Sequence, residues 1–93
     1  MKAQASSINE PIDVFDTRFN YFPKTFLWRG KTHHVRSVDR CWTVSRRRLL
    51  NRVERHCFRV RTADATYDLY QDPARDLWYL DRVVTGPGRL DDL

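Results

Sequence analysis

A chain of 93 residues can build one domain around a single hydrophobic core, and so small a domain leaves little room for a buried catalytic cavity. Its 41% apolar and 13% aromatic residues exclude a disordered chain. The sequence contains neither an apolar run that could span a membrane nor a signal-peptide core, so a cytoplasmic protein without membrane contact is expected.

The net charge of +5 is concentrated in the middle of the chain. Residues 29–61 carry eleven basic side chains against two acidic ones, whereas residues 62–93 carry three basic against seven acidic. The middle third is therefore the part of the chain that could attract an anionic partner.

The first third of the chain predicts strands. Residues 1–10 are polar and predict a flexible N-terminal tail. Apolar and polar side chains alternate over residues 11–16, which predicts a short edge strand, and residues 18–23 follow as a loop. The β-rich residues 25–28 predict the next strand, and Gly30 supplies the positive φ that a tight hairpin turn requires.

The middle of the chain predicts a long strand and an insertion. Residues 32–44 alternate, but their register changes near Arg36 and Ser37, which predicts a bulge that curls the sheet. Residues 45–56 break the alternation. Their apolar residues share a helical face, yet the arginines at their start oppose the helix dipole, so a short helix and an ordered basic loop both remain open.

The last third of the chain predicts three strands. Phe58 and Val60 alternate with Arg59 and Arg61, which predicts a strand with one apolar and one basic face. Turn-rich segments separate the further strands predicted at residues 67–70 and 77–84, and residues 85–93 are expected to form a flexible tail.

These elements predict a mainly β fold. Residues 11–84 are expected to form a single antiparallel meander, bent into a strongly curved sheet or open barrel, with one short helical or loop insertion.

Short motifs in fixed order also carry a family resemblance. They are Phe26-Leu27-Trp28-Arg29-Gly30-Lys31, Phe58-Arg59-Val60, Tyr67-Asp68-Leu69-Tyr70 and Trp78-Tyr79-Leu80-Asp81-Arg82-Val83. Together they resemble a small bacterial domain family of uncharacterised function, found alone or at the C-terminal end of proteins similar to Y-family DNA-repair polymerases. The resemblance implies a β-rich accessory module linked to DNA repair, and it brings no catalytic residues. Residues 43–56 depart from it, because they are rich in arginine and leucine where a more acidic, proline-containing loop is expected.

A basic region interleaved with aromatic residues is typical of nucleic-acid-binding sheets, because guanidinium groups neutralise phosphates and flat rings stack on unpaired bases. The candidate binding residues are Arg36, Arg40, Arg46, Arg47, Arg48, Arg59 and Arg61. The predicted partners are single-stranded DNA or RNA, or a DNA-repair protein.

Two alternatives to nucleic-acid binding remain open. Trp28, Trp42 and Trp78 are expected in the core rather than as stacking platforms. The domain could instead be a protein-interaction or structural module, in which the aspartates of the last third complement the basic middle in a partner or a second copy. The same aspartates could also neutralise the arginines within the fold, and the domain would then bind no nucleic acid. The sequence leaves the oligomeric state open.

No catalytic, cofactor or metal site is predicted. Cys41 and Cys57 are expected as reduced thiols, and no pair of cysteines or histidines shows the short spacing of a zinc site. His33 and His34 are neighbours on a predicted strand and should point to opposite faces, one buried and one exposed. The chain is accordingly not expected to be an enzyme.

Overall fold

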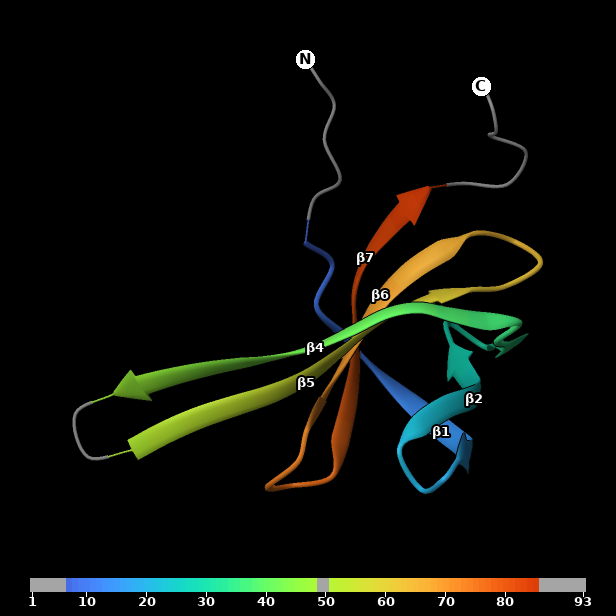
Figure 1. Cartoon of the computed structure of the whole chain (residues 1–93). Coiled ribbons are helices and arrows are strands. Elements are labelled where there is room, and N and C mark those ends of the chain that lie inside the picture. The colour runs from blue at the N-terminus through green and yellow to red at the C-terminus, as the bar shows by residue number, and fades with distance from the viewer. Residues whose placement is uncertain (1–6, 49–50, 86–93) are drawn as a thin grey trace, which may run out of the picture.

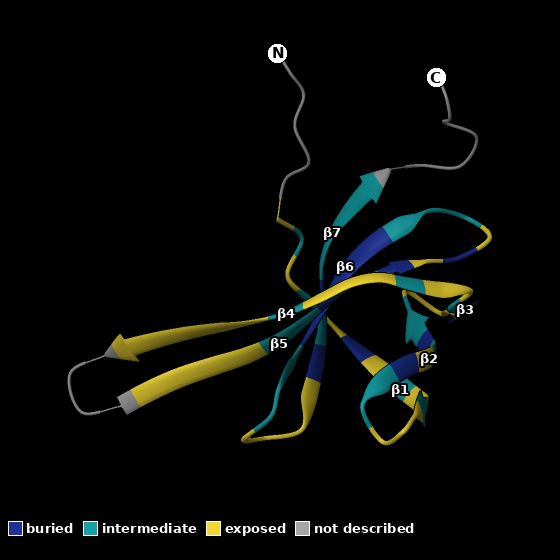
Figure 2. Ribbon diagram, in the orientation of Figure 1, coloured by how far each residue is buried: buried dark blue, intermediate teal, exposed yellow. Residues whose placement is uncertain are grey.

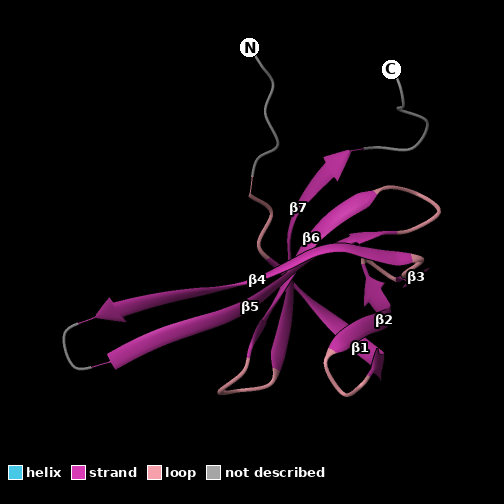
Figure 3. Ribbon diagram, viewed as in Figure 1, coloured by secondary structure: helices cyan, strands magenta, loops and turns pink. Residues whose placement is uncertain are grey.

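A computed structural model describes residues 7–48 and 51–85, which form seven antiparallel strands in one sheet (Figures 1 and 3). The strands are β1 (Glu10–Arg18), β2 (Phe22–Trp28), β3 (Lys31–His34), β4 (Ser37–Arg48), β5 (Asn51–Arg61), β6 (Thr66–Asp72) and β7 (Leu77–Thr85). The mainly β class and the antiparallel arrangement are confirmed. The described residues include no helix that could cross a membrane.

Two meanders make up the sheet. Its strand order is β3-β2-β1-β7-β6-β5-β4, so every pair of consecutive strands is hydrogen-bonded except β3 and β4, and the first strand pairs with the last. The sheet curves strongly but is not closed into a barrel. Val35 and Arg36 carry the chain from one end of the sheet to the other: the Val35 amide donates to the Lys24 carbonyl of β2 at 2.8 Å, and the Arg36 amide donates to the Arg61 carbonyl of β5 at 2.7 Å.

The core lies on the concave face of this sheet. Its fully buried side chains come from four strands, β2, β5, β6 and β7; among them are Phe26, Phe58, Val60, Leu69 and Leu80. Strict alternation on β5 places Phe58 and Val60 inside and turns Arg59 and Arg61 to the other side, as predicted. We call this second side, opposite the core, the outer face.

The turn between β2 and β3 has the predicted glycine. Trp28 pairs with Lys31, so the loop has two residues, and both Arg29 and Gly30 adopt positive φ angles of 51° and 76°. Two consecutive positive φ angles are typical of a hairpin turn whose twist matches that of the flanking strands.

Three local predictions are wrong. β1 is not an edge strand, because it pairs with both β2 and β7. The prediction failed because alternation in the sequence reports which face of a strand is buried, but not which of its edges are hydrogen-bonded. The loop predicted at residues 18–23 is shorter, because β2 already begins at Phe22. The strand predicted at residues 32–44 is divided at Val35 and Arg36 into β3 and β4, and the bulge lies between Val38 and Arg40.

The insertion predicted at residues 45–56 is neither a helix nor a loop. β4 continues to Arg48 and β5 begins at Asn51, and their register runs without interruption from Arg40–Arg59 to Arg48–Asn51. Both faces of this segment are exposed, so no apolar period is required there, and the pairing of β4 with β5 decides its conformation. Leu49 and Leu50, on which the helical reading partly rested, lie outside the described residues.

The outer part of this hairpin is a free-standing two-stranded ribbon. β6 pairs with β5 only as far as His56, so residues 44–48 and 51–55 have no third strand beside them. We call these residues the arm. Figure 1 shows the arm projecting away from the body, and Figure 2 shows that it is exposed along both strands. Of the predicted tails, residues 1–6 and 86–93 lie outside the described residues.

Candidate nucleic-acid interface

The two faces of the arm differ in charge. Directly opposed pairs share a face, so Val44 with Arg55 and Arg46 with Val53 place two arginines and two valines on the outer face. Ser45 with Glu54 and Arg47 with Arg52 occupy the opposite, inner face. The arm's single acidic residue, Glu54, is therefore on the inner face, and the outer face carries only positive charge.

On the body of the sheet, the outer face continues as a row of guanidinium groups and aromatic rings. The Arg40 guanidinium lies over the half-buried Trp42 ring, 4.8 Å from its centroid. Arg55 lies over Tyr70 at 4.3 Å, and Tyr70 in turn stacks on Tyr79 with ring centroids 5.0 Å apart. Tyr70 is buried beneath these neighbours, so its ring is not accessible to a ligand. The ring of Trp42, which lies beside the arm, is only half-buried and is therefore partly accessible.

Buried surroundings also affect the hydroxyl of Tyr70. It donates a hydrogen bond to the Asn9 side-chain oxygen, and burial raises its pKa above the ordinary value. A neutral tyrosine ring therefore lies beneath the Arg55 guanidinium at the base of the arm.

Two of the predicted binding arginines are neutralised within the fold. Arg59 donates two hydrogen bonds, of 2.8 and 3.1 Å, to the buried carboxylate of Asp68, and these bonds raise the pKa of Arg59. Arg61 donates to Asp39 at 2.6 Å. The predicted neutralisation by an aspartate of the last third is thus seen for Arg59 with Asp68, whereas the carboxylate beside Arg61, Asp39, comes from the middle third itself.

The remaining predicted residues do not form one continuous patch. Arg40 and Arg46 lie on the outer face, Arg47 lies on the inner face opposite Arg52, and Arg48 ends β4 opposite Asn51. Arg36 lies at the corner between β3 and β4, at the far end of β4 from the arm.

Arg55 and Trp42 lie on the same outer face as Arg40 and Arg46, although neither was among the predicted binding residues. Reading residues 51–61 as one strand would have found Arg55, because Val53, Arg55 and Cys57 alternate in register with Arg59. The tryptophan prediction holds for Trp78, which is buried in the core, but Trp28 and Trp42 are only half-buried.

The cysteines and histidines do not assemble into a site. Cys41 and Cys57 are free thiols whose strand partners, Phe58 and Trp42, place them on opposite faces of the sheet. His33 is buried and His34 exposed, as predicted. Within residues 7–48 and 51–85, no group of three or more histidine, cysteine or carboxylate side chains could hold a metal ion.

Comparison with known proteins gives a family without a function. A family model described as a domain of unknown function (DUF6504) matches residues 2–85. No curated protein and no solved structure matches the chain.

Proposed function

We propose, for a chain that belongs to the DUF6504 family of domains of unknown function, that the outer face of the arm binds single-stranded nucleic acid. The observation that carries the proposal is the segregation of charge on the arm. Within residues 7–48 and 51–85, its outer face presents Arg46 and Arg55 without a paired carboxylate, and the only acidic residue of the arm points to the other side.

Electrostatics favour a phosphate ligand at this face. Exposed arginines that lack a neighbouring carboxylate can neutralise phosphates, and each phosphate that they neutralise releases a cation that had been condensed on the nucleic-acid backbone. The arm reaches out from the body, so a strand of nucleic acid can lie along it without steric obstruction from the rest of the sheet (Figure 1).

The preference for single-stranded over duplex nucleic acid is inferred from Trp42 and the two valines of the arm, Val44 and Val53. Trp42 borders the arm on the outer face, and Val44 and Val53 expose 37% and 40% of their surface between the arginines. Unpaired bases can stack on a partly open ring and cover apolar side chains, whereas the bases of a duplex are already stacked on one another. The proposed role is that of a non-catalytic accessory module.

Fluorescence anisotropy of labelled single-stranded and duplex DNA tests the proposal. The double variant Arg46→Ala/Arg55→Ala is expected to bind the single strand at least about tenfold more weakly than the unaltered protein. Its plot of log affinity against log salt, measured between about 50 and 200 mM, should lose about 1.4 of its slope, since each lost phosphate contact accounts for roughly 0.7.

A matched control is available on the same arm. Arg47→Ala/Arg52→Ala removes the same charge from the inner face and should weaken binding less. Trp42→Leu should weaken binding of the single strand more than binding of duplex DNA, because it removes a stacking surface without changing charge. Equal losses in the two arginine variants would mean that net charge alone attracts DNA, and the outer-face site would then be rejected.

A protein-interaction module is the second candidate function. The ion pairs of Arg59 with Asp68 and of Arg61 with Asp39 favour it, because they remove part of the positive surface on the body. In this case the unaltered protein would bind neither DNA even at low salt. The link to DNA repair implied by the family resemblance is a further part of the proposal, in which the domain acts beside a repair protein.

A further inference from the structure

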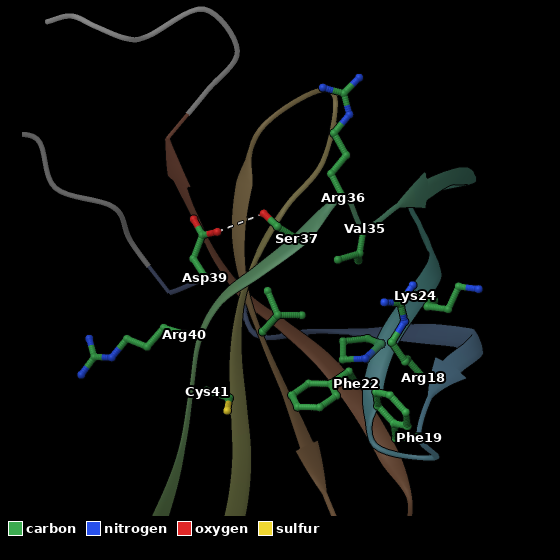
Figure 4. A pocket seen from close by; sticks show the side chains of 12 residues that line it. Arg18, Phe19, Phe22, Lys24, Val35, Arg36, Ser37, Asp39, Arg40 and Cys41 are labelled. Atoms are coloured by element: carbon green, nitrogen blue, oxygen red, sulfur yellow. Dashed lines mark hydrogen bonds between the residues drawn. The ribbon is translucent and has the colours of Figure 1, made fainter.

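A groove lies where the sheet fails to close. It has a volume of about 470 Å³ and runs between the first residues of β2 and the first residues of β4 (Figure 4). Phe22, Pro23, Val35 and Val38 supply its apolar lining. Its basic lining comes mainly from Arg18, Lys24 and Arg36, all exposed, and its one acidic residue, Asp39, is hydrogen-bonded to Ser37 and Arg61.

The backbone on one side of the groove lacks a strand partner. β4 is the last strand of the sheet, so alternate amides and carbonyls of residues 37–41 point away from β5. On the opposite side, β3 pairs with β2 only from Thr25 onward, and beyond the end of β3 the Lys24 carbonyl accepts the hydrogen bond from the Val35 amide. The edge of β4 is therefore the side of the groove to which a further strand can be added.

Phe19 marks the entrance to the groove. This side chain lines it, exposes 83% of its surface and sits at a φ of 56°. Asn20 also adopts a positive φ, of 54°, so the turn between β1 and β2 accounts for this backbone conformation and holds the ring at the surface. A large exposed ring beside a groove offers apolar surface to a ligand.

We propose that this groove binds an extended peptide in which acidic and apolar side chains alternate, added as a strand to the free edge of β4. Main-chain hydrogen bonds to residues 37–41 hold the peptide. Its apolar side chains cover Phe22 and Val38, and its carboxylates face Arg18 and Arg36. The proposal concerns a separate site from the arm and does not depend on nucleic-acid binding.

Charge decides against the other occupants. A second copy of this chain paired along β4 would oppose arginine-rich strands, since β4 carries Arg40, Arg46, Arg47 and Arg48 against the single acidic residue Asp39. A nucleic-acid strand would satisfy the cations but would leave the main-chain groups at the edge of β4 and the apolar lining without matching partners.

Nuclear magnetic resonance of the full chain tests the groove. The probe is a synthetic peptide of about seven residues, a usual strand length, in which leucine alternates with glutamate. At about 1 mM peptide, where weak binding is still detected, amide signals of residues 37–41 are expected to shift and to exchange more slowly with solvent. The same peptide with lysine in place of glutamate should leave them unchanged.

Matched variants locate the site. Arg18→Glu/Arg36→Glu should weaken the peptide at least about tenfold, whereas Arg47→Glu/Arg52→Glu on the arm should not. Phe19→Ala should also weaken it, and Phe15→Ala, which removes another exposed ring from outside the groove, should not. Because all of these side chains are exposed, the variants are expected to fold.

Four results would overturn the proposal: no shift at residues 37–41 with the acidic peptide, equal binding of the lysine peptide, the same shifts produced by oligothymidine alone, or the same shifts produced by self-association as the protein concentration rises.

Discussion

His33 is a buried titratable residue surrounded by aromatic rings. It is 5% exposed, stacks on Phe26 with ring centroids 4.9 Å apart and contacts Trp28 and Tyr67 edge-on or tilted. Its Nδ1 atom lies 3.5 Å from an Asp64 carboxylate oxygen, and neither ring nitrogen has a hydrogen-bond partner among the described residues. Burial lowers the pKa of His33, Asp64 opposes that shift, and Lys31 and His34 add to it.

A neutral His33 makes stability depend on pH. The unfolded chain binds a proton near pH 6.5, whereas the folded chain binds it only at lower pH, so stability is complete above about pH 6.5 and falls below it. The urea midpoint should therefore be lower at about pH 5.5 than at about pH 7.5. His33→Phe should flatten this dependence and His34→Gln should not; an unchanged dependence in His33→Phe would assign it to another group.

Asp68 and Asp39 offer a comparison between a buried and an exposed ion pair. Asp68 is buried and lies near two arginines, Arg59 at 2.8 Å and Arg82 at 3.8 Å, whereas Asp39 and Arg61 are exposed. Asp68→Asn should lower the free energy of unfolding by about 1–3 kcal/mol, because it weakens hydrogen bonds to charged groups that remain in place. Asp39→Asn should change it by less than about 1 kcal/mol. Urea denaturation measures both, and equal effects would show that burial of Asp68 does not strengthen its pairs.

At the scale of the element, the arm contributes no side chain to the hydrophobic core of the described residues. Beyond Thr43 and His56 the two strands pair only with each other, and Arg55 over Tyr70 is a contact between the arm and the body. An isolated two-stranded ribbon is marginally stable in water, so the arm draws its order from the strands that continue into the body.

Removal of the arm is expected to abolish DNA binding and to leave the stability of the remaining domain nearly unchanged. Replacing residues 44–55 by a two-residue Asn-Gly turn between Thr43 and His56 keeps the β4–β5 pairing inside the body. The circular dichroism spectrum should remain that of a β protein, and the urea midpoint should change little. Anisotropy should show that affinity for single-stranded DNA falls to the background. A shortened protein that still binds DNA would move the site to the body of the sheet.

The arm also shows how far the sequence predicts this fold. Alternation identified the strands whose two faces differ in polarity, such as β5 with Phe58 inside and Arg59 outside. It failed over residues 45–56, because both faces of the arm are exposed and no apolar period is required there. The site was predicted in part for the same reason: a basic region is visible in the sequence, but the partners of Arg59 and Arg61 depend on which strands are neighbours.

At the scale of the whole molecule, the missing pairing between β3 and β4 leaves two free edges in the sheet. Every other consecutive pair of strands is hydrogen-bonded, so the free edge of β4 and the groove beside it both follow from this interruption. The arm and the groove lie toward opposite ends of β4. The two proposed binding surfaces therefore share one strand, and each can be altered without changing the other.

The pairing of β1 with β7 has a consequence for the rate of folding. Glu10 and Leu80 pair directly although they lie near opposite ends of the sequence, whereas the other paired strands follow one another in the chain. The two meanders can form from local contacts, but joining them requires closure of a long loop, and such non-local contacts slow folding. Ile12→Ala in β1, a buried residue that opposes Trp78 across the junction, should then mainly accelerate unfolding, and Leu69→Ala in β6 should mainly slow folding, in stopped-flow measurements. If the ranking were reversed, the contact between the chain's first and last strands would be the nucleus from which the domain condenses.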